Sequence, residues 1–236
     1  PYLNDPSTKG IATMSQDELN ELVLTAQKKG LMASLHSIGD GAMEMSLNAI
    51  EYAEMNCPRA DMRHAIVHCQ ISTEDLLKKF KKLNVVAHIQ PAFIDTDMYV
   101  VEERVGKEKA KTSYAWKTMH DLGVHMAFGS DSPVISLSVM EGLYCAVTRK
   151  DLAGNPENGW IPEQAISLYD AVYAYTMGGA YASYDDGRKG SITKGKYADM
   201  VILDKNIFDI PVEEIKDTKV LKTIVDGKIV YERGSN

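Results

Sequence analysis

The stretch Val124-His125-Met126-Ala127-Phe128-Gly129-Ser130-Asp131-Ser132-Pro133 joins an apolar run to an aspartate and a turn. The apolar part is typical of a short buried strand, so Asp131 is predicted to follow the carboxyl end of that strand. Two earlier apolar runs end in the same way, in His36 and in His68. Three strand-like segments therefore each deliver one side chain that suits a divalent metal.

Helices are predicted before and between the first strands. Ser15–Lys29 has the helical spacing of apolar residues, Ser15 and Glu18 form a capping-box pattern, and Gly30 ends the helix. The segments that follow alternate: strand Leu31–Ser37, helix Asp40–Met55, strand His64–Cys69, helix Thr73–Leu83 and strand Val85–Gln90. This order predicts parallel strands with helical crossovers.

The segment Pro91–Ala115 interrupts this alternation, because it is polar and rich in charged residues. We expect a long loop that acts as a lid or contacts substrate. The remaining expected elements are helices at Trp116–Leu122, Ser138–Arg149 and Pro162–Ala182, and a strand at Val124–Gly129.

The last part of the chain has a different pattern. Asp199–Asp204 and Val220–Val230 are short β runs, and Asp226-Gly227 predicts a hairpin turn. A complete (β/α)8 barrel takes about 250 residues. Only four barrel-type strands are found here. The predicted fold class is therefore α/β: strands five to eight of a TIM-type barrel at residues 1–186, and a small β-sandwich segment at residues 187–236.

Composition limits the function classes. The 236-residue chain has a net charge of −7, which argues against nucleic acid or an anionic membrane as a partner. No apolar run is long enough to span a bilayer. The three cysteines are odd in number and form no CxxC pattern, so a reducing compartment, the cytoplasm, is expected.

The candidate site follows from side-chain alternation along the strands. If one face of each strand points into a barrel, four residues form its top layer: His36, His68, Gln90 and Asp131. His64, a deeper residue, is interpreted as a core or supporting group. The chemistry that suits such a layer is metal-assisted hydrolysis, in which a divalent ion lowers the pKa of water and Asp131 serves as general acid and base.

Five motifs together resemble a known family. They are His36–Asp40, Arg63–Gln70, Gln90-Pro91, Ala127–Pro133 and Gly190–Asp204. In this set the chain is similar to the amidohydrolase superfamily, in its YtcJ-like (amidohydrolase-3) branch. The resemblance implies a (β/α)8 barrel with a composite β-sandwich, one or two zinc or related ions, and hydrolysis of a C–N bond in a non-peptide or cyclic amide.

The resemblance also implies roles for single residues. His36 and His68 match the metal-binding histidines of strands five and six, and Asp131 matches the strand-eight aspartate, which is metal ligand and general acid/base. Apart from the resemblance, the expected substrate contacts are Gln90 and His64, from strand alternation, and Arg104, from the long loop.

The chain departs from the family pattern in what it contains. The strand-one His-x-His pair and the strand-four bridging residue have no counterpart, Gly41 stands where this branch often has arginine, and Val67 where glutamate is common. We therefore expect a C-terminal fragment that is inactive alone, acts on a small molecule in the full-length protein, and self-associates through exposed half-barrel edges. The alternative is a non-catalytic regulatory or binding protein on the same scaffold.

Overall fold

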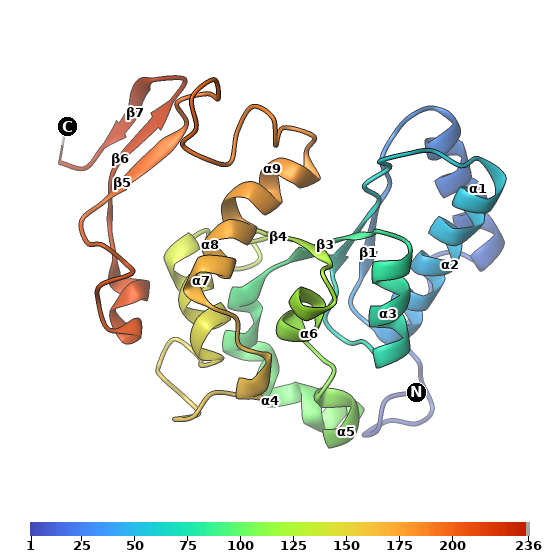
Figure 1. Ribbon diagram of the computed structural model, residues 1–236. Helices are drawn as coiled ribbons and strands as arrows, with labels where there is room; N and C mark the ends of the chain where they lie inside the picture. Colours follow the sequence, from blue (N-terminus) through green and yellow to red (C-terminus); the bar gives the residue numbers. More distant parts are fainter. Residues whose placement is uncertain (235–236) are drawn as a thin grey trace. The chain divides into compact units, whose positions relative to one another are not determined.

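The computed structural model describes residues 1–234, which form two compact units. Unit 1 consists of Pro1–Ile89 and Thr96–Met126. Unit 2 consists of Gln90–Asp95 and the described residues from Ala127 onward. Figure 1 shows the order of the elements along the chain by colour. The expected boundary between residues 186 and 187 stays a prediction.

Unit 1 alternates helices and strands, as the sequence predicts. In chain order its elements are α1 (Gln16–Lys28), β1 (Ser34–Ser37), α2 (Asp40–Asn56), β2 (Ala65–His68), α3 (Glu74–Lys82), β3 (Val86–Ile89), α4 (Ile94–Val105), α5 (Lys107–Ala110), α6 (Trp116–Asp121) and the start of β4 (His125–Phe128).

The strands form one sheet in the order β1-β2-β3-β4. β1 pairs in parallel with β2, and β2 in parallel with β3, so the helical crossovers predicted from the sequence are confirmed. Each observed strand has four residues and is shorter than expected. The core lies between the sheet and its helices and includes fully buried Leu47 and Ile50 of α2 and Phe80 of α3.

Local signals explain where the first helices begin. The Ser15 side chain accepts a hydrogen bond from the Glu18 N–H, and the Glu18 carboxylate accepts one from the Ser15 N–H, so the predicted capping box is confirmed. At α3 the Thr73 hydroxyl caps the Leu76 N–H. Acidic residues in the first turn of α3 and lysines in its last turn complement the helix dipole.

The segment 91–115 is not the expected loop. It contains the 3-10 helix η1 (Pro91–Phe93), then α4, and then α5 after Gly106. Three apolar residues at helical spacing, Ile94, Met98 and Val101, are all buried. The charged residues between them occupy the other faces of α4. The amino-acid composition of the segment is therefore polar although it forms a helix. The expectation of a loop was therefore wrong.

Unit 2 is mostly helical in its first half. After the end of β4 it contains α7 (Val139–Thr148), the 3-10 helix η2 (Pro162–Gln164), α8 (Leu168–Tyr173), the π-helical turn η3 (Ala174–Gly178) and α9 (Gly179–Ala182). The single helix expected at 162–182 thus begins only at Leu168, because Ala165 and Ser167 have extended backbone conformations.

The end of unit 2 is a three-stranded antiparallel sheet. Its strands are β5 (Met200–Leu203), β6 (Val220–Val225) and β7 (Lys228–Glu232), in that order, and the 3-10 helix η4 (Val212–Asp217) lies between β5 and β6. Asp226 and Gly227 have φ of 50° and 75°, as a type I′ turn requires. The predicted hairpin is confirmed.

Two further features of the described chain are the state of its thiols and the character of its helices. The three cysteines of the described chain are all free. Burial raises the pKa of the Cys69 thiol, and burial with the nearby charges of Asp95 and Glu141 raises the pKa of Cys145 to about 12. Within residues 1–234, no helix is both long enough and apolar enough to cross a membrane.

Candidate metal centre

The rings of His36 and His68 lie against each other in unit 1. His36 is on β1, and His68 is the last residue of β2. The His36 Nδ1 and His68 Nε2 atoms are 3.1 Å apart, and the ring centroids are 4.6 Å apart at an interplanar angle of 77°. His36 is exposed, whereas His68 is buried. The structure thus brings two of the three expected ligands together.

The backbone at the end of β2 explains how the two rings meet. In the parallel register, His36 pairs with Val67 and Ser37 pairs with His68. Because side chains alternate along a strand, this register alone assigns His68 to the face of Ser37, opposite to His36. However, His68 and Cys69 both have left-handed backbone conformations, with φ of 78° and 53°. The left-handed residue breaks the alternation and turns the His68 ring toward His36.

Such a turn needs support, because a left-handed conformation costs about 1–3 kcal/mol at a residue with a side chain. Part of the support comes from the β1–α2 connection. The Cys69 N–H donates to the Ser37 carbonyl at 3.2 Å, and the Ile71 N–H donates to the Ile38 carbonyl at 2.9 Å. The Cys69 thiol donates to the Ile66 carbonyl at 3.1 Å.

The histidine pair fits a divalent metal as two of its ligands. Two nitrogens bound to one tetrahedral zinc ion at about 2.0–2.1 Å are about 3.3 Å apart, and the observed separation is 3.1 Å. Within residues 1–234, however, no three histidine, cysteine or acidic side chains are grouped so that they could hold a metal ion. Unit 1 therefore presents a pair of imidazoles, to which a complete metal site would have to add further ligands.

Asp131, the third expected ligand, belongs to unit 2 and is exposed. It also has a left-handed backbone conformation, with φ of 61°. Its carbonyl accepts a hydrogen bond from the Val134 N–H at 2.9 Å, which closes a turn directly after β4. Phe128, the last residue of β4, packs edge-to-face on Tyr175, with ring centroids 5.4 Å apart. The chain leading to Asp131 is thus anchored in the core of unit 2.

The expected substrate contacts have different surroundings. Gln90 is buried in unit 2, directly before η1. Arg104 is on α4 of unit 1, where its backbone carbonyl accepts a hydrogen bond from the Leu3 N–H. Its surroundings form a hollow that is also lined by Tyr2, Asn4, Asp5 and Thr8. No contact described for unit 1 joins Arg104 to the histidine pair.

His64 is deeply buried directly before β2, at the end of that strand opposite to His68. Its Nδ1 accepts a hydrogen bond from the Ala33 N–H at 2.9 Å, so the proton of the neutral ring is on Nε2, which is 2.8 Å from the Gln27 Oε1. Gln27 in turn donates to the carbonyls of Ala53 and Cys57. Both ring nitrogens are therefore engaged in joining α1, α2 and the sheet.

We expect His64 to make folding sensitive to acid. Burial lowers the pKa of His64, so the folded state binds this proton more weakly than the unfolded state, whose histidine pKa is about 6.5. The stability from the neutral ring is complete above pH 6.5 and is lost as the pH falls toward the folded-state pKa. The measurement is the free energy of unfolding in urea at pH 5 to 8. Its slope against pH should be smaller in His64→Gln than in wild type, by an amount that corresponds to at most one proton.

The control for this experiment is His120→Gln on α6, where the histidine is exposed. It tests whether the removal of a histidine outside the buried contacts of His64 also flattens the pH dependence. Burial also lowers the pKa values of His88 and His125, so part of the acid sensitivity should remain in His64→Gln. Identical slopes in wild type and His64→Gln would contradict the role of the neutral ring.

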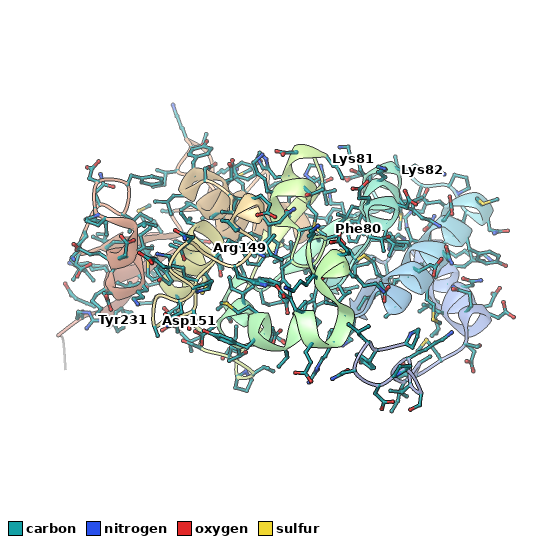
Figure 2. All side chains as sticks on the ribbon, turned by 90° about the horizontal axis from the view of Figure 1, so that it is seen from below. Phe80, Lys81, Lys82, Arg149, Asp151 and Tyr231 are labelled. Atoms are coloured by element: carbon teal, nitrogen blue, oxygen red, sulfur yellow. The ribbon has the colours of Figure 1, made fainter. Side chains whose placement is uncertain are left out.

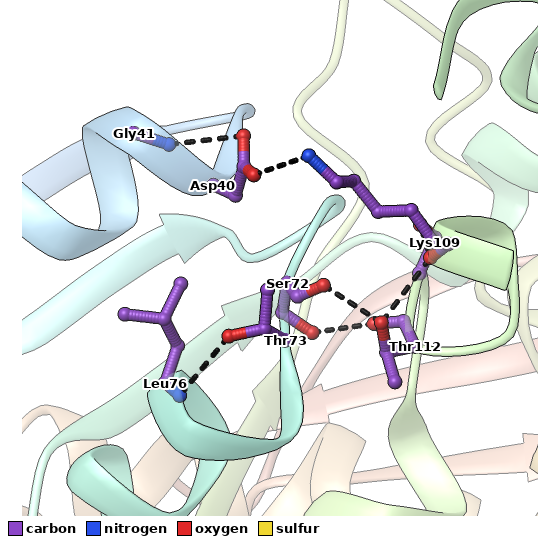
Figure 3. Close-up of polar contacts among 8 residues, drawn as sticks. Asp40, Gly41, Ser72, Thr73, Leu76, Lys109 and Thr112 are labelled. Carbon is purple, nitrogen blue, oxygen red and sulfur yellow. Dashed lines mark hydrogen bonds and ion pairs between the residues drawn. The ribbon is translucent and has the colours of Figure 1, made fainter. Parts of the chain in front are cut away.

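The segment that contains α4 and α5 is attached to the turns that follow β1 and β2 (Figure 3). Lys109 Nζ is 2.7 Å from Asp40 Oδ2, in the first turn of α2. Burial raises the pKa of Asp40, but the hydrogen bond and charge of Lys109 outweigh it and lower the pKa overall. The Thr112 hydroxyl donates to the Ser72 carbonyl at 2.7 Å, and the Ser72 hydroxyl donates to the Thr112 carbonyl.

A parallel α/β sheet with paired histidines at the ends of adjacent strands is an arrangement that suits a metal-dependent hydrolase. One solved structure of such a protein is similar to this chain. An uncharacterized metal-dependent hydrolase from Pyrococcus horikoshii OT3 is 29% identical, with a TM-score of 0.77 over 90% of this chain and 42% of that one.

The chain belongs to the amidohydrolase family, whose model matches residues 1–231. YtcJ of Bacillus subtilis strain 168, named as an amidohydrolase, is 32% identical over 99% of this chain and 44% of its own length. The N-substituted formamide deformylase of Arthrobacter pascens is 30% identical over 93% of this chain and 40% of its own length. The chain thus spans less than half the length of these relatives.

Proposed function

We propose that the full-length protein is a divalent-metal hydrolase, with zinc as the first candidate ion, that cleaves the C–N bond of a non-peptide or cyclic amide. In this proposal His36, His68 and Asp131 are metal ligands, and Asp131 is also the general acid/base. The observation that carries the proposal is the 3.1 Å separation of His36 Nδ1 and His68 Nε2. Membership of the amidohydrolase family supports the choice of bond.

The bound metal would supply Lewis acidity, which polarises the carbonyl and lowers the pKa of water. His36 and His68 would hold it through their ring nitrogens. Asp131 takes one proton from the attacking water while the water oxygen bonds to the carbonyl carbon. The same carboxyl then gives this proton to the departing nitrogen as the C–N bond breaks. The products are a carboxylic acid and an amine, so atoms and charges balance.

The relatives suggest which substrates to try first. One relative is named as a deformylase of N-substituted formamides, and this class of small linear amide is the first probe we propose. The four parallel strands are further proposed to be half of a (β/α)8 barrel, completed in the full-length protein. The free thiols support a cytoplasmic location. Self-association through β1, an outer strand of the sheet, is a proposal that light scattering tests.

The experiment that tests the function is zinc titration by calorimetry, with wild type beside His36→Ala and Asp131→Ala. We expect about one zinc per wild-type chain and, in both variants, a loss of affinity greater than the about 10–100-fold that removal of a supporting contact causes. His120→Ala, an exposed histidine on α6, is the matched control and should bind as wild type does.

Zinc binding that survives in both variants, or that is absent from wild type, would contradict the metal role of these residues in this chain. Turnover is measured separately, as amine released from N-substituted formamides by the full-length protein. Zinc binding without amine release from formamides or cyclic amides would favour the non-catalytic alternative.

A further inference from the structure

Asp97 on α4 accepts hydrogen bonds from Gln70, which is in the turn after β2, and from Tyr114, which contacts that turn. Its Oδ2 accepts a hydrogen bond from Gln70 Nε2 at 3.2 Å and another from the Tyr114 hydroxyl. The Tyr114 N–H donates to the Gln70 carbonyl at 2.7 Å. Gln70 and Tyr114 are 7% and 2% exposed. The network is thus largely shielded from water, where hydrogen bonds are electrostatically stronger.

Gln70 comes two residues after His68 and directly after the second left-handed residue, Cys69. Whatever holds Gln70 therefore limits the conformations open to the turn. Gln70 is held at its backbone by Tyr114 and at its side chain by Asp97. The backbone bonds of Cys69 and Ile71 to the β1–α2 connection fix the rest of the turn.

The other attachments of the α4–α5 segment lie further from His68. The Lys109–Asp40 ion pair is 38% exposed on both sides, and partly exposed pairs contribute little. The Ser72–Thr112 bonds act at the start of α3. Among these attachments, the contact of Asp97 with Gln70 is the nearest in sequence to His68.

We propose that Asp97 is a positioning residue for the histidine pair: through Gln70 it keeps the turn after β2 in the left-handed conformation that directs the His68 ring at His36. Without this contact the Gln70 side chain is released. The strain at His68 and Cys69 then favours the regular β conformation. That conformation restores the side-chain alternation along β2 and moves the His68 ring away from His36.

The experiment compares Asp97→Ala and Asp97→Asn with wild type. The primary measurement needs no metal: ¹⁵N-resolved NMR of the imidazole rings, with the nuclear Overhauser effect between the His36 and His68 rings. Zinc affinity is the second measurement, and it alone rests on the proposed function. Glu103→Ala is the matched control, because Glu103 is an exposed carboxylate on the same helix and accepts a hydrogen bond from the Asn4 side chain.

We expect Asp97→Ala to lose the inter-ring Overhauser effect, to shift the His68 ring signals and to weaken zinc about 10–100-fold. Asp97→Asn should recover most of both, because its amide oxygen can still accept from Gln70 and Tyr114. Glu103→Ala should resemble wild type. If Asp97→Ala does not fold, Tyr114→Phe removes one of the two hydrogen bonds and should shift the same signals.

Unchanged ring signals in folded Asp97→Ala, or in Tyr114→Phe, would overturn the inference. A further outcome distinguishes the positioning role of Asp97 from the metal role of the histidines: the ring signals shift in Asp97→Ala, but wild type binds no zinc. In that case the positioning role stands and the metal role fails.

Discussion

Gly142→Ala should destabilise unit 2, although alanine is normally the better helix former. Gly142 is in the middle of α7, and a Cβ built there would lie 1.9 Å from the Tyr175 hydroxyl and 2.9 Å from the ring carbon that bears it. Either the Tyr175 side chain or one of the two helical segments must move. Overpacking of this kind costs about 1–3 kcal/mol, and the short distance places Gly142 at the upper end of that range. The measurement is the free energy of unfolding in urea.

Two further variants make the experiment specific to Tyr175. At Gly179, in the same unit and also helical, a Cβ meets nothing within 4 Å, so Gly179→Ala should not destabilise. Combining Gly142→Ala with Tyr175→Phe removes the nearest atom and should recover part of the loss. A double variant no better than Gly142→Ala alone would count against the contact as the cause.

Arg149→Ala should also cost several kcal/mol. Arg149 follows α7, is fully buried, and is labelled in Figure 2. Its Nε donates to the Trp160 carbonyl at 3.1 Å, its guanidinium lies 5.0 Å from the Trp160 ring centroid, and the Trp160 N–H donates to the Arg149 carbonyl at 2.7 Å. Truncation leaves a cavity and buried polar groups without this partner, for which we expect about 3–5 kcal/mol.

Arg149→Lys should recover little, because a lysine ammonium can neither stack flat on the indole nor reproduce the guanidinium hydrogen bonds. Arg188→Ala is the control in the same unit, since Arg188 is exposed and pairs with Asp185 on the surface. Urea unfolding measures all three variants. A loss at Arg188→Ala equal to that at Arg149→Ala would mean that burial at Trp160 is not the source of the effect.

The sequence predicts the fold well where its signals are local. The capping box at Ser15 and the Asp226-Gly227 turn each specify one backbone geometry, and both are observed. In α4 the apolar spacing of Ile94, Met98 and Val101 was present, but the many charges around it concealed the helix. A count of apolar residues at positions i, i+4 and i+7 would have found it.

The site is predictable only in part. Three metal-capable side chains at strand ends can be found from the pattern of apolar runs, and two of them touch. The way in which they touch cannot be found from that pattern. Alternation along β2 does not yield a left-handed backbone at His68 and Cys69, because residues with a side chain adopt this conformation only uncommonly and nothing in the apolar pattern marks these two positions. Gln70 was visible in its motif, but its link to Asp97 depends on the fold of a distant helix.

The burial of two thiols has a practical consequence. Thiolate is the form that reacts with maleimides and similar reagents, and Cys69 and Cys145 are buried with raised pKa values. Cys57, directly after α2, is half-buried and is the remaining thiol of the described chain. A fluorophore or spin label added to the native protein would therefore attach at one place, in unit 1. Cys57 is thus a natural labelling site in the unit that contains the histidine pair, and no substitution is needed to create it.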